Sequence, residues 1–329
     1  MRVFVAGASG ALGSRLVPQL INAGHDVIGT YNSPTSAGLV RTLGARPVML
    51  DVLDADAVRK AVLEGEPEAI VHQATALANV KFSRSLDKAF AKTNQLRTTG
   101  TDALLAAARE AGVRRFVAQS FASYRYIRAG GPIKTEDDPL DPTPPRNTPQ
   151  TWAAMTYLDR EVTDFGGIAL RYGGFYGADD DGWAELVRKR WFPIVGDGGG
   201  MISWIHLEDA AAATVLALGH DGPAIYNIVD DDPAPVREWL PVLAQSVGAE
   251  PPRRWPTWLA RLLVGEAAVV MGTEARGASN AKAKRELGWA LRYPSWRNGF
   301  ATAYASITPA DQPTLQPAAW TSHVSRGYR

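Results

Sequence analysis

Three glycines near the N-terminus have a spacing that could bind phosphate. Gly7, Gly10 and Gly13 follow the apolar run 3–6 and precede an apolar periodic segment that starts at Leu12. Between a strand and a helix, such glycines allow a tight turn, close approach of a pyrophosphate and close helix packing. The free N–H groups of the helix N-terminus also favour phosphate. The segment predicts dinucleotide binding, with Ser9, Ala11 and Leu12 as further backbone contacts; a structural turn is the alternative.

The elements that must position this loop repeat along the first 119 residues. Apolar runs predict strands at 26–31, 46–50, 68–72 and 115–119, and helical periodicity predicts helices at 36–43, 55–63 and 86–111. This alternation predicts an α/β fold with a parallel, doubly wound sheet. Ligands bind beyond the carboxyl ends of such strands. The candidate cofactor contacts there are Tyr31, Asn32, Ser33, Asp51, Val52, Gln73, Ala74, Thr75 and Gln119, with Asn94 from the long helix.

Two of these candidates have structural alternatives. Asp51 could instead cap the helix that follows it, and Asn94 could be a structural or solvent-facing amide. The end of the second strand distinguishes two cofactors, because a carboxylate there binds the ribose 2′-hydroxyl of NAD. Residues 30–33 contain none. We therefore expect NADP in preference to NAD.

Composition excludes several classes of function. The chain has 35 basic and 34 acidic residues, so no strong field draws it to nucleic acid or to an anionic membrane. It has no cysteine, which excludes disulfides and thiolate chemistry. No apolar run reaches the roughly 20 residues of a membrane span, and the first strand begins too early for a signal peptide. We expect a cytoplasmic protein without a metal, since the aspartates at 179–181 are typical of a solvated loop.

The motifs together resemble those of the NAD-dependent epimerase/dehydratase family, which belongs to the extended short-chain dehydrogenases/reductases. The segments that carry the resemblance are 7–13, 51–52, 94–108, 112–117, 170–177, 203–211, 226–228 and 283–289. The resemblance implies a Rossmann-type sheet over residues 1–174, completed by about 203–230, and a smaller substrate-binding region from 175–202 and 231–305. Residues 306–329 are expected to form a loose tail. Tyr172, Gly173 and Gly174 would lie beside the nicotinamide.

The sequence departs from this family at its usual catalytic residues. The family uses a Ser or Thr after the fifth strand and a Tyr-x-x-x-Lys motif at the start of the next helix, where the Tyr acts as the acid/base. Counting back from the sixth strand places Thr151 and Met155 at the Tyr and Lys positions. Tyr157 lies about 240° around the helix from Thr151 and should face elsewhere, as part of a surface or packing pair with Glu161.

The remaining catalytic candidates follow the fifth strand. Ser120 and Ser123 lie close to where the family has its catalytic hydroxyl, and Tyr124 begins a long, proline-containing loop. Each has a structural alternative, which is a hydroxyl bonded to local backbone or a tyrosine that packs the loop.

Aromatic residues predict the substrate pocket, since such pockets are mostly apolar. His206 would line the substrate side or brace the junction of the two regions, and residues 188–190 are basic enough to meet an anion or to form a solvated helix face. The expected substrate contacts are Phe121, Phe175, Tyr176, Trp183, Trp191, Trp204 and His206.

Three hypotheses of function follow. The first is an NAD(P)-dependent oxidoreductase or epimerase-like enzyme that acts on a small, largely apolar carbonyl or alcohol, with atypical acid/base residues. The second is a non-redox isomerase, cyclase or lyase on the same fold, and the third is a dinucleotide sensor without catalysis. Family members often pair through long helices, so we expect a homodimer through the helices at 86–111 and 151–165.

Overall fold

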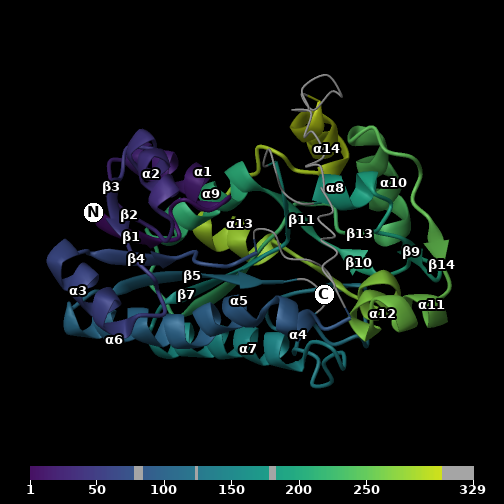
Figure 1. The fold of residues 1–329 in the computed structure, drawn as a ribbon, viewed down its shortest axis with the longest axis horizontal. Coiled ribbons are helices and arrows are strands. Elements are labelled where there is room, and N and C mark those ends of the chain that lie inside the picture. Colours follow the sequence, from purple (N-terminus) through teal and green to yellow (C-terminus); the bar gives the residue numbers. More distant parts are fainter. Residues whose placement is uncertain (78–83, 123–124, 178–182, 306–329) are drawn as a thin grey trace, which may run out of the picture.

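The computed structural model describes residues 1–77, 84–122, 125–177 and 183–305. A seven-stranded sheet in the order β12-β7-β5-β4-β1-β2-β3 forms its centre, and every neighbouring pair in it is parallel. This confirms the Rossmann-type doubly wound fold (Figure 1). The strands are β1 (Arg2–Ala6), β2 (Asp26–Tyr31), β3 (Arg46–Met49), β4 (Ala69–His72), β5 (Arg115–Phe121), β7 (Ile168–Tyr172) and β12 (Ala224–Ile228).

Helices cover both faces of the sheet (Figure 1). Alternate residues of a strand point to opposite faces. Val3 and Val5 therefore pack on one side, against α1 (Gly13–Asn22), α9 (Leu207–Ala217) and α13 (Ala281–Leu287). Phe4 packs on the other side, against α3 (Ala55–Gly65), α6 (Thr101–Glu110) and α7 (Pro149–Asp164). The short α2 (Ala37–Thr42) connects β2 to β3.

The helix expected at 86–111 is interrupted. It consists of α4 (Leu86–Ala89), α5 (Ala91–Gln95), a π-helical turn (Leu96–Gly100) and α6. A π turn leaves backbone carbonyls without regular helical partners. Here His72 Nε2 lies 3.2 Å from the Leu96 carbonyl, and the Thr101 hydroxyl donates to the Arg97 carbonyl at 3.0 Å. Side chains thus stabilise the irregular turn next to Asn94.

The smaller C-terminal region has an aromatic core. It includes β8 (Gly174–Tyr176), α8 (Trp183–Arg188), β11 (Trp204–His206), α10 (Val236–Ser246) and α14 (Trp296–Tyr304). Trp204 and Trp239 pack edge to face with ring centroids 4.8 Å apart. The remaining elements are η1 (Pro34–Ser36), β6 (Ile133–Lys134), β9 (Ile194–Val195), β10 (Met201–Ile202), β13 (Ala234–Pro235), β14 (Arg254–Trp255), α11 (Thr257–Leu263), α12 (Glu266–Thr273) and β15 (Gly277–Ala278). None of the helices in the described ranges combines the length and apolar character needed to cross a bilayer.

Candidate functional site

The glycine loop joins β1 to α1 as expected. Gly7 has a φ of +93°, which favours glycine, and its N–H donates to the Thr30 hydroxyl at 3.0 Å. A Cβ on Gly13 would lie 2.3 Å from the Gly7 carbonyl oxygen, so no side chain fits there. Gly10 is exposed, and its N–H donates to the Gly7 carbonyl at 3.1 Å. Gly7 and Gly13 hold the turn tight, and Gly10 leaves its outer face open.

Backbone amides of this loop are available to a ligand. Within the described chain, the N–H groups of Ser9, Ala11 and Leu12 have no hydrogen-bond acceptor. They lie at the N-terminus of a ten-residue helix, where free amides and the helix dipole favour phosphate. The loop therefore fits the pyrophosphate of a dinucleotide.

Two buried amide oxygens lack partners near the carboxyl end of β4. Gln73 Oε1 and Asn94 Oδ1 are both buried, and neither has a hydrogen-bond partner within the described residues. The amide nitrogen of Asn94 donates to the Thr151 hydroxyl at 3.1 Å, and that of Gln73 lies 3.5 Å from the Tyr172 hydroxyl. Buried polar atoms normally have partners. A ligand N–H or O–H beyond the strand ends would supply them.

The other expected cofactor contacts lie around the same edge of the sheet. Asn32 is exposed, and Ser33 Oγ lies 2.8 Å from the Thr35 hydroxyl. Asp51 accepts from the Leu53 amide at 3.0 Å, whereas Asp54 caps α3, so the alternative role for Asp51 is wrong. Val52, Ala74, Thr75 and Gln119 lie at or just beyond the ends of β3, β4 and β5, and Tyr31 ends β2.

Gly173 and Gly174 have a packing reason as well as an expected cofactor role. A Cβ on Gly173 would lie 2.6 Å from the Ser203 carbonyl oxygen, and one on Gly174 would lie 3.0 Å from the Trp204 ring. Tyr172 is fully buried, and its hydroxyl lies 2.6 Å from that of Thr214. These glycines let β8 approach β11 closely.

Thr151 and Met155 lie on the buried side of α7, with exposures of 3% and 1%. The Thr151 hydroxyl donates to Asp87 Oδ1 at 2.7 Å while it accepts from Asn94. Met155 is an apolar side chain without a titratable proton. Neither residue offers a free acid to a bound substrate.

Tyr157 faces away from this position. Its hydroxyl donates to Asp102 on α6 at 2.7 Å, and the guanidinium of Arg160 lies over its ring. The hydrogen bond to Asp102, together with partial burial, raises the pKa of Tyr157 to about 12. The expected orientation is confirmed, and the hydroxyl binds Asp102 rather than forming the predicted surface or packing pair with Glu161.

Ser120 belongs to a buried polar network between β5, β7 and α7. It is 1% exposed and accepts a 3.2 Å hydrogen bond from Arg125. The same guanidinium donates to Asp159 at 3.1 Å. This geometry holds the Ser120 hydroxyl inside the protein. The candidates Ser123 and Tyr124 lie outside the described residues.

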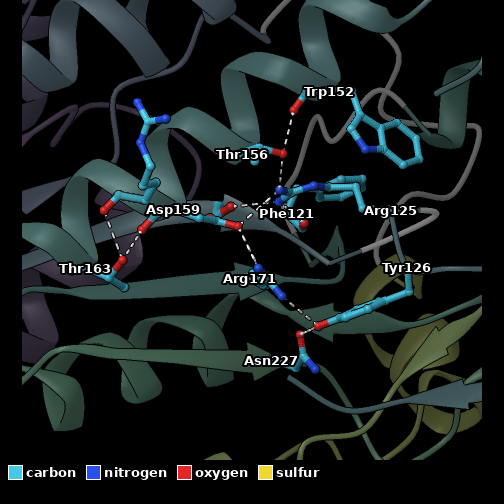
Figure 2. A network of polar contacts seen from close by, with 11 residues as sticks. Phe121, Arg125, Tyr126, Trp152, Thr156, Asp159, Thr163, Arg171 and Asn227 are labelled. Carbon is cyan, nitrogen blue, oxygen red and sulfur yellow. Dashed lines mark hydrogen bonds and ion pairs between the residues drawn. The ribbon is translucent and has the colours of Figure 1, made fainter. Parts of the chain in front are cut away.

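Two arginines share one carboxylate in this network (Figure 2). Arg171 donates to Asp159 at 2.9 Å and to the Tyr126 hydroxyl at 3.1 Å, and Tyr126 donates to Asn227 at 2.7 Å. Burial opposes ionisation of Asp159, but Arg125 and Arg171 outweigh it and hold the pKa of its carboxyl below the usual value. Sequence reasoning missed this network because its charged residues come from separate segments.

The expected aromatic substrate wall is largely packed core. Tyr176 and Trp204 are 0% and 1% exposed, and Trp183 packs edge to face on Trp204 with centroids 5.5 Å apart. Phe121 packs against the same core and Phe175 against Tyr172, whereas Trp191 is 65% exposed. An apolar composition does not distinguish a pocket wall from a core, so for Tyr176 and Trp204 the pocket prediction is replaced by a packing role.

His206 caps α9 and is largely buried. Its Nδ1 accepts from the Glu208 amide at 3.1 Å, and its ring stacks on Tyr293 with centroids 3.8 Å apart. Burial, with the nearby charges of Arg15 and Arg292, lowers the pKa of His206 to about 4. The ring is therefore neutral near pH 7 and braces the junction between the two regions.

The basic residues expected to meet an anion are instead partnered, since Lys189 pairs with Glu185, Arg190 pairs with Glu250 and Arg188 donates to the Val247 carbonyl. In the described ranges, His, Asp and Glu form no cluster suited to a metal, and residues 179–181 lie outside those ranges.

A cavity that the sequence did not predict lies next to the N-terminus of α7 and has a volume of about 600 Å³. The cavity is lined by Arg84, Arg146, Asn147, Arg261, Gly265 and Glu266.

Comparisons with known proteins identify the family of the chain and agree with its fold. The profile of the NAD-dependent epimerase/dehydratase family matches residues 3–229. A "3-diazoavenalumate denitrifying reductase" from a Streptomyces species is 40% identical over 312 residues, which cover 91% of this chain and 99% of that protein. The UDP-glucose 4-epimerase of Thermotoga maritima superposes with a TM-score of 0.74 at 20% identity, covering 93% of this chain and 98% of the other. The Thermus thermophilus enzyme, solved with NAD, gives 0.70 at 22% identity and coverage of 94% and 100%.

Proposed function

The chain belongs to the NAD-dependent epimerase/dehydratase family, and from that premise we propose that it is a nicotinamide-dependent reductase of a small arenediazonium compound. The family and the reductase relative make it an enzyme. The relative at 40% identity is named for the removal of diazo nitrogen, and the similarity extends over nearly its whole length. The observation that carries the proposal is the pair Thr151 and Met155 on α7, which provides no proton donor.

A diazonium substrate, which already carries the positive charge, explains why a proton donor is unnecessary. Reduction of a carbonyl makes an alkoxide, so an acid beside the oxygen accelerates it by about 10²–10⁴-fold. Replacement of a diazonium group is different. A bound reduced nicotinamide would supply a hydride, so the electron pair of the new C–H bond would come from the cofactor and the pair of the broken C–N bond would leave with N₂. The cofactor would be oxidised, the carbon reduced, and no proton consumed.

The chain's own residues would bind and orient the reactants. The free amides of Ser9, Ala11 and Leu12 would bind the pyrophosphate. The unpartnered oxygens of Gln73 and Asn94 would accept hydrogen bonds from the cofactor at the strand ends. Ser120 holds β5 in place through Arg125 and does not touch the reactants in this proposal.

We propose NADPH as the preferred reductant. Asn32 and Ser33 follow β2, and residues 30–33 include no carboxylate that would repel a 2′-phosphate. The Ser33 and Thr35 hydroxyls lie 2.8 Å apart at this strand end and could both donate to phosphate oxygens.

The proposal is tested with two substrates that differ at one group. The enzyme is supplied with NADPH and either 4-carboxybenzenediazonium or 4-formylbenzoate, which carries an aldehyde in place of the diazo group. We expect NADPH oxidation matched by benzoate and N₂ with the first substrate, and little turnover of the second. Heat-inactivated enzyme corrects for direct reduction by NADPH. Turnover of the aldehyde alone would assign the enzyme to carbonyl reduction and overturn the proposal.

A further inference from the structure

The arginine-lined cavity lies where three segments meet. Arg84 precedes α4, Arg146 and Asn147 precede α7, and Arg261 lies in the last turn of α11. The lining contains three guanidinium groups and one carboxylate, from Glu266, which is a formal excess of two positive charges. A volume of about 600 Å³ is within the range of small-molecule sites.

In the described parts of the chain, no carboxylate lies within ion-pair distance of the guanidinium groups of Arg84, Arg146 or Arg261. The Glu266 carboxylate instead accepts a 2.7 Å hydrogen bond from the Arg146 backbone amide. The charges of all three side chains are thus available to a ligand.

Asn147 fixes the shape of the cavity. Its Oδ1 accepts from the Ala267 amide at 3.0 Å, and its Nδ2 lies 3.5 Å from the Val264 carbonyl oxygen. Gly265, with a φ of +101°, passes so close that a Cβ there would lie 2.4 Å from Asn147 Nδ2. The turn between α11 and α12 is therefore held against the loop before α7, which places Arg261 and Arg146 on the same cavity.

The cavity is also tied to the position of the expected chemistry. The Asp87 amide donates to the Asn147 carbonyl at 3.2 Å, and Asp87 Oδ1 accepts from the Thr151 hydroxyl. Thr151 in turn accepts from Asn94. Asn147 lies just before the first turn of α7, which carries Thr151, so the cavity adjoins that turn.

We propose that this cavity binds the carboxylate of an organic acid substrate. Guanidinium groups bind carboxylates through paired, charge-assisted hydrogen bonds. The excess of two positive charges would also attract a diphosphate, and titration with UDP distinguishes the two ligands. The inference rests on the proposed function for the reacting end of the substrate, whereas the carboxylate site itself is independent of the chemistry.

Calorimetry without turnover tests the site. The enzyme, saturated with NADP⁺, is titrated with cinnamate, with its neutral amide cinnamamide, and with UDP. We expect cinnamate to bind at least about tenfold more tightly than cinnamamide. Arg146→Gln and Arg261→Gln should each raise the Kd for cinnamate about tenfold. Arg254→Gln, the same change on exposed β14 outside the cavity, is the matched control and should leave binding unchanged.

The outcomes separate this site from the proposed reaction. Equal binding of cinnamate and cinnamamide, or equal loss in the Arg254 variant, would overturn the carboxylate site. Binding of UDP that depends on Arg146 and Arg261, without binding of cinnamate, would also overturn it. Arginine-dependent binding of cinnamate by an enzyme that turns over no diazo compound would support the site and refute the reaction instead.

Discussion

Asn94 Nδ2 donates a 3.1 Å hydrogen bond to Thr151 Oγ1, and that hydroxyl donates its own proton to Asp87 at 2.7 Å. The hydroxyl at this position is therefore fully engaged within the protein. It positions Asn94, whose Oδ1 has no hydrogen-bond partner in the described chain, and it has no proton to give to a substrate.

Thr151→Val tests this division of roles, since valine keeps the shape and removes the hydroxyl. We expect the free energy of unfolding to fall by about 1–3 kcal/mol because Asn94 Nδ2 loses its partner. The kcat for diazo reduction should fall less than about tenfold, and Thr151→Ser should restore stability. A loss of about 10²–10⁴ in kcat would show instead that the hydroxyl is a proton donor.

Gly13→Ala should disrupt the conformation in which the glycine loop binds phosphate. The new Cβ would lie 2.3 Å from the Gly7 carbonyl oxygen, so the turn must open. We expect the Kd for NADP⁺, measured by calorimetry, to rise at least about tenfold, which corresponds to about 1.4 kcal/mol. Gly38→Ala on α2 is the matched control. Its Cβ meets no atom within 4 Å, and alanine there should raise helix stability by up to about 1 kcal/mol. An unchanged Kd in the Gly13 variant would refute phosphate binding by this loop.

Asn32→Asp should change the choice of cofactor. A carboxylate after β2 would repel a 2′-phosphate and could accept from a ribose hydroxyl. We expect the ratio of kcat/KM for NADPH over NADH to fall at least about tenfold, a coupling of about 1.4 kcal/mol. Asn22→Asp, at the C-terminal end of α1, makes the same change away from the strand ends and should leave the ratio unchanged. If the ratio of kcat/KM for NADPH over NADH changes equally in both variants, the proposed NADP site is wrong.

Asp159→Asn should destabilise the protein far more than a surface carboxylate change. The variant leaves the buried Arg125 and Arg171 without their shared negative charge. Breaking a buried ion pair costs about 3–5 kcal/mol. Glu161→Gln, on the same helix, removes an ion pair with the exposed Arg160 and should cost less than about 1 kcal/mol. Denaturant unfolding of both variants measures the difference, and equal losses would contradict the structural role of the network.

The neutral state of His206 predicts a specific pH dependence. The pKa of His206 is about 4 in the folded protein and 6.5 when unperturbed. Between these values the imidazole is protonated in the unfolded state but neutral in the folded state. Its contribution to stability is complete above about pH 6.5 and is lost as the pH falls toward 4, by about 1 kcal/mol at pH 5.5. His206→Asn keeps a helix-capping oxygen but does not titrate. The stability difference between wild type and variant should therefore shrink by about 1 kcal/mol between pH 7.5 and pH 5.5. A constant difference would contradict this account.

The sequence predicted the fold where local pattern and tertiary structure agree. Apolar runs marked β1, β2, β4 and β5, and the glycine spacing marked the turn after β1, because only glycine fits at Gly13. The interruption of the long helix was not predictable. Residues 96–100 contain no proline to mark a break, and the π turn is contacted by His72, which is distant in sequence.

The site was less predictable because its parts come from separate segments. Arg84, Arg146 and Arg261 have nothing in common in sequence, and only the docking of α11 and α12 on the loop before α7 brings them onto one cavity. Residues 188–190 formed the more visible basic run, yet acids on neighbouring turns and loops neutralise Lys189 and Arg190. Local charge density therefore did not indicate the arginines of the cavity.

The central claim is that hydride passes to the carbon that loses nitrogen, without an acid. It is tested most directly with NADPH deuterated at C4 and 4-carboxybenzenediazonium in ordinary water. We predict benzoate with one deuterium at the former diazo carbon, one N₂ for each NADPH oxidised, and no solvent isotope effect on kcat. Benzoate whose new hydrogen comes from water, or a marked solvent isotope effect, would contradict the account.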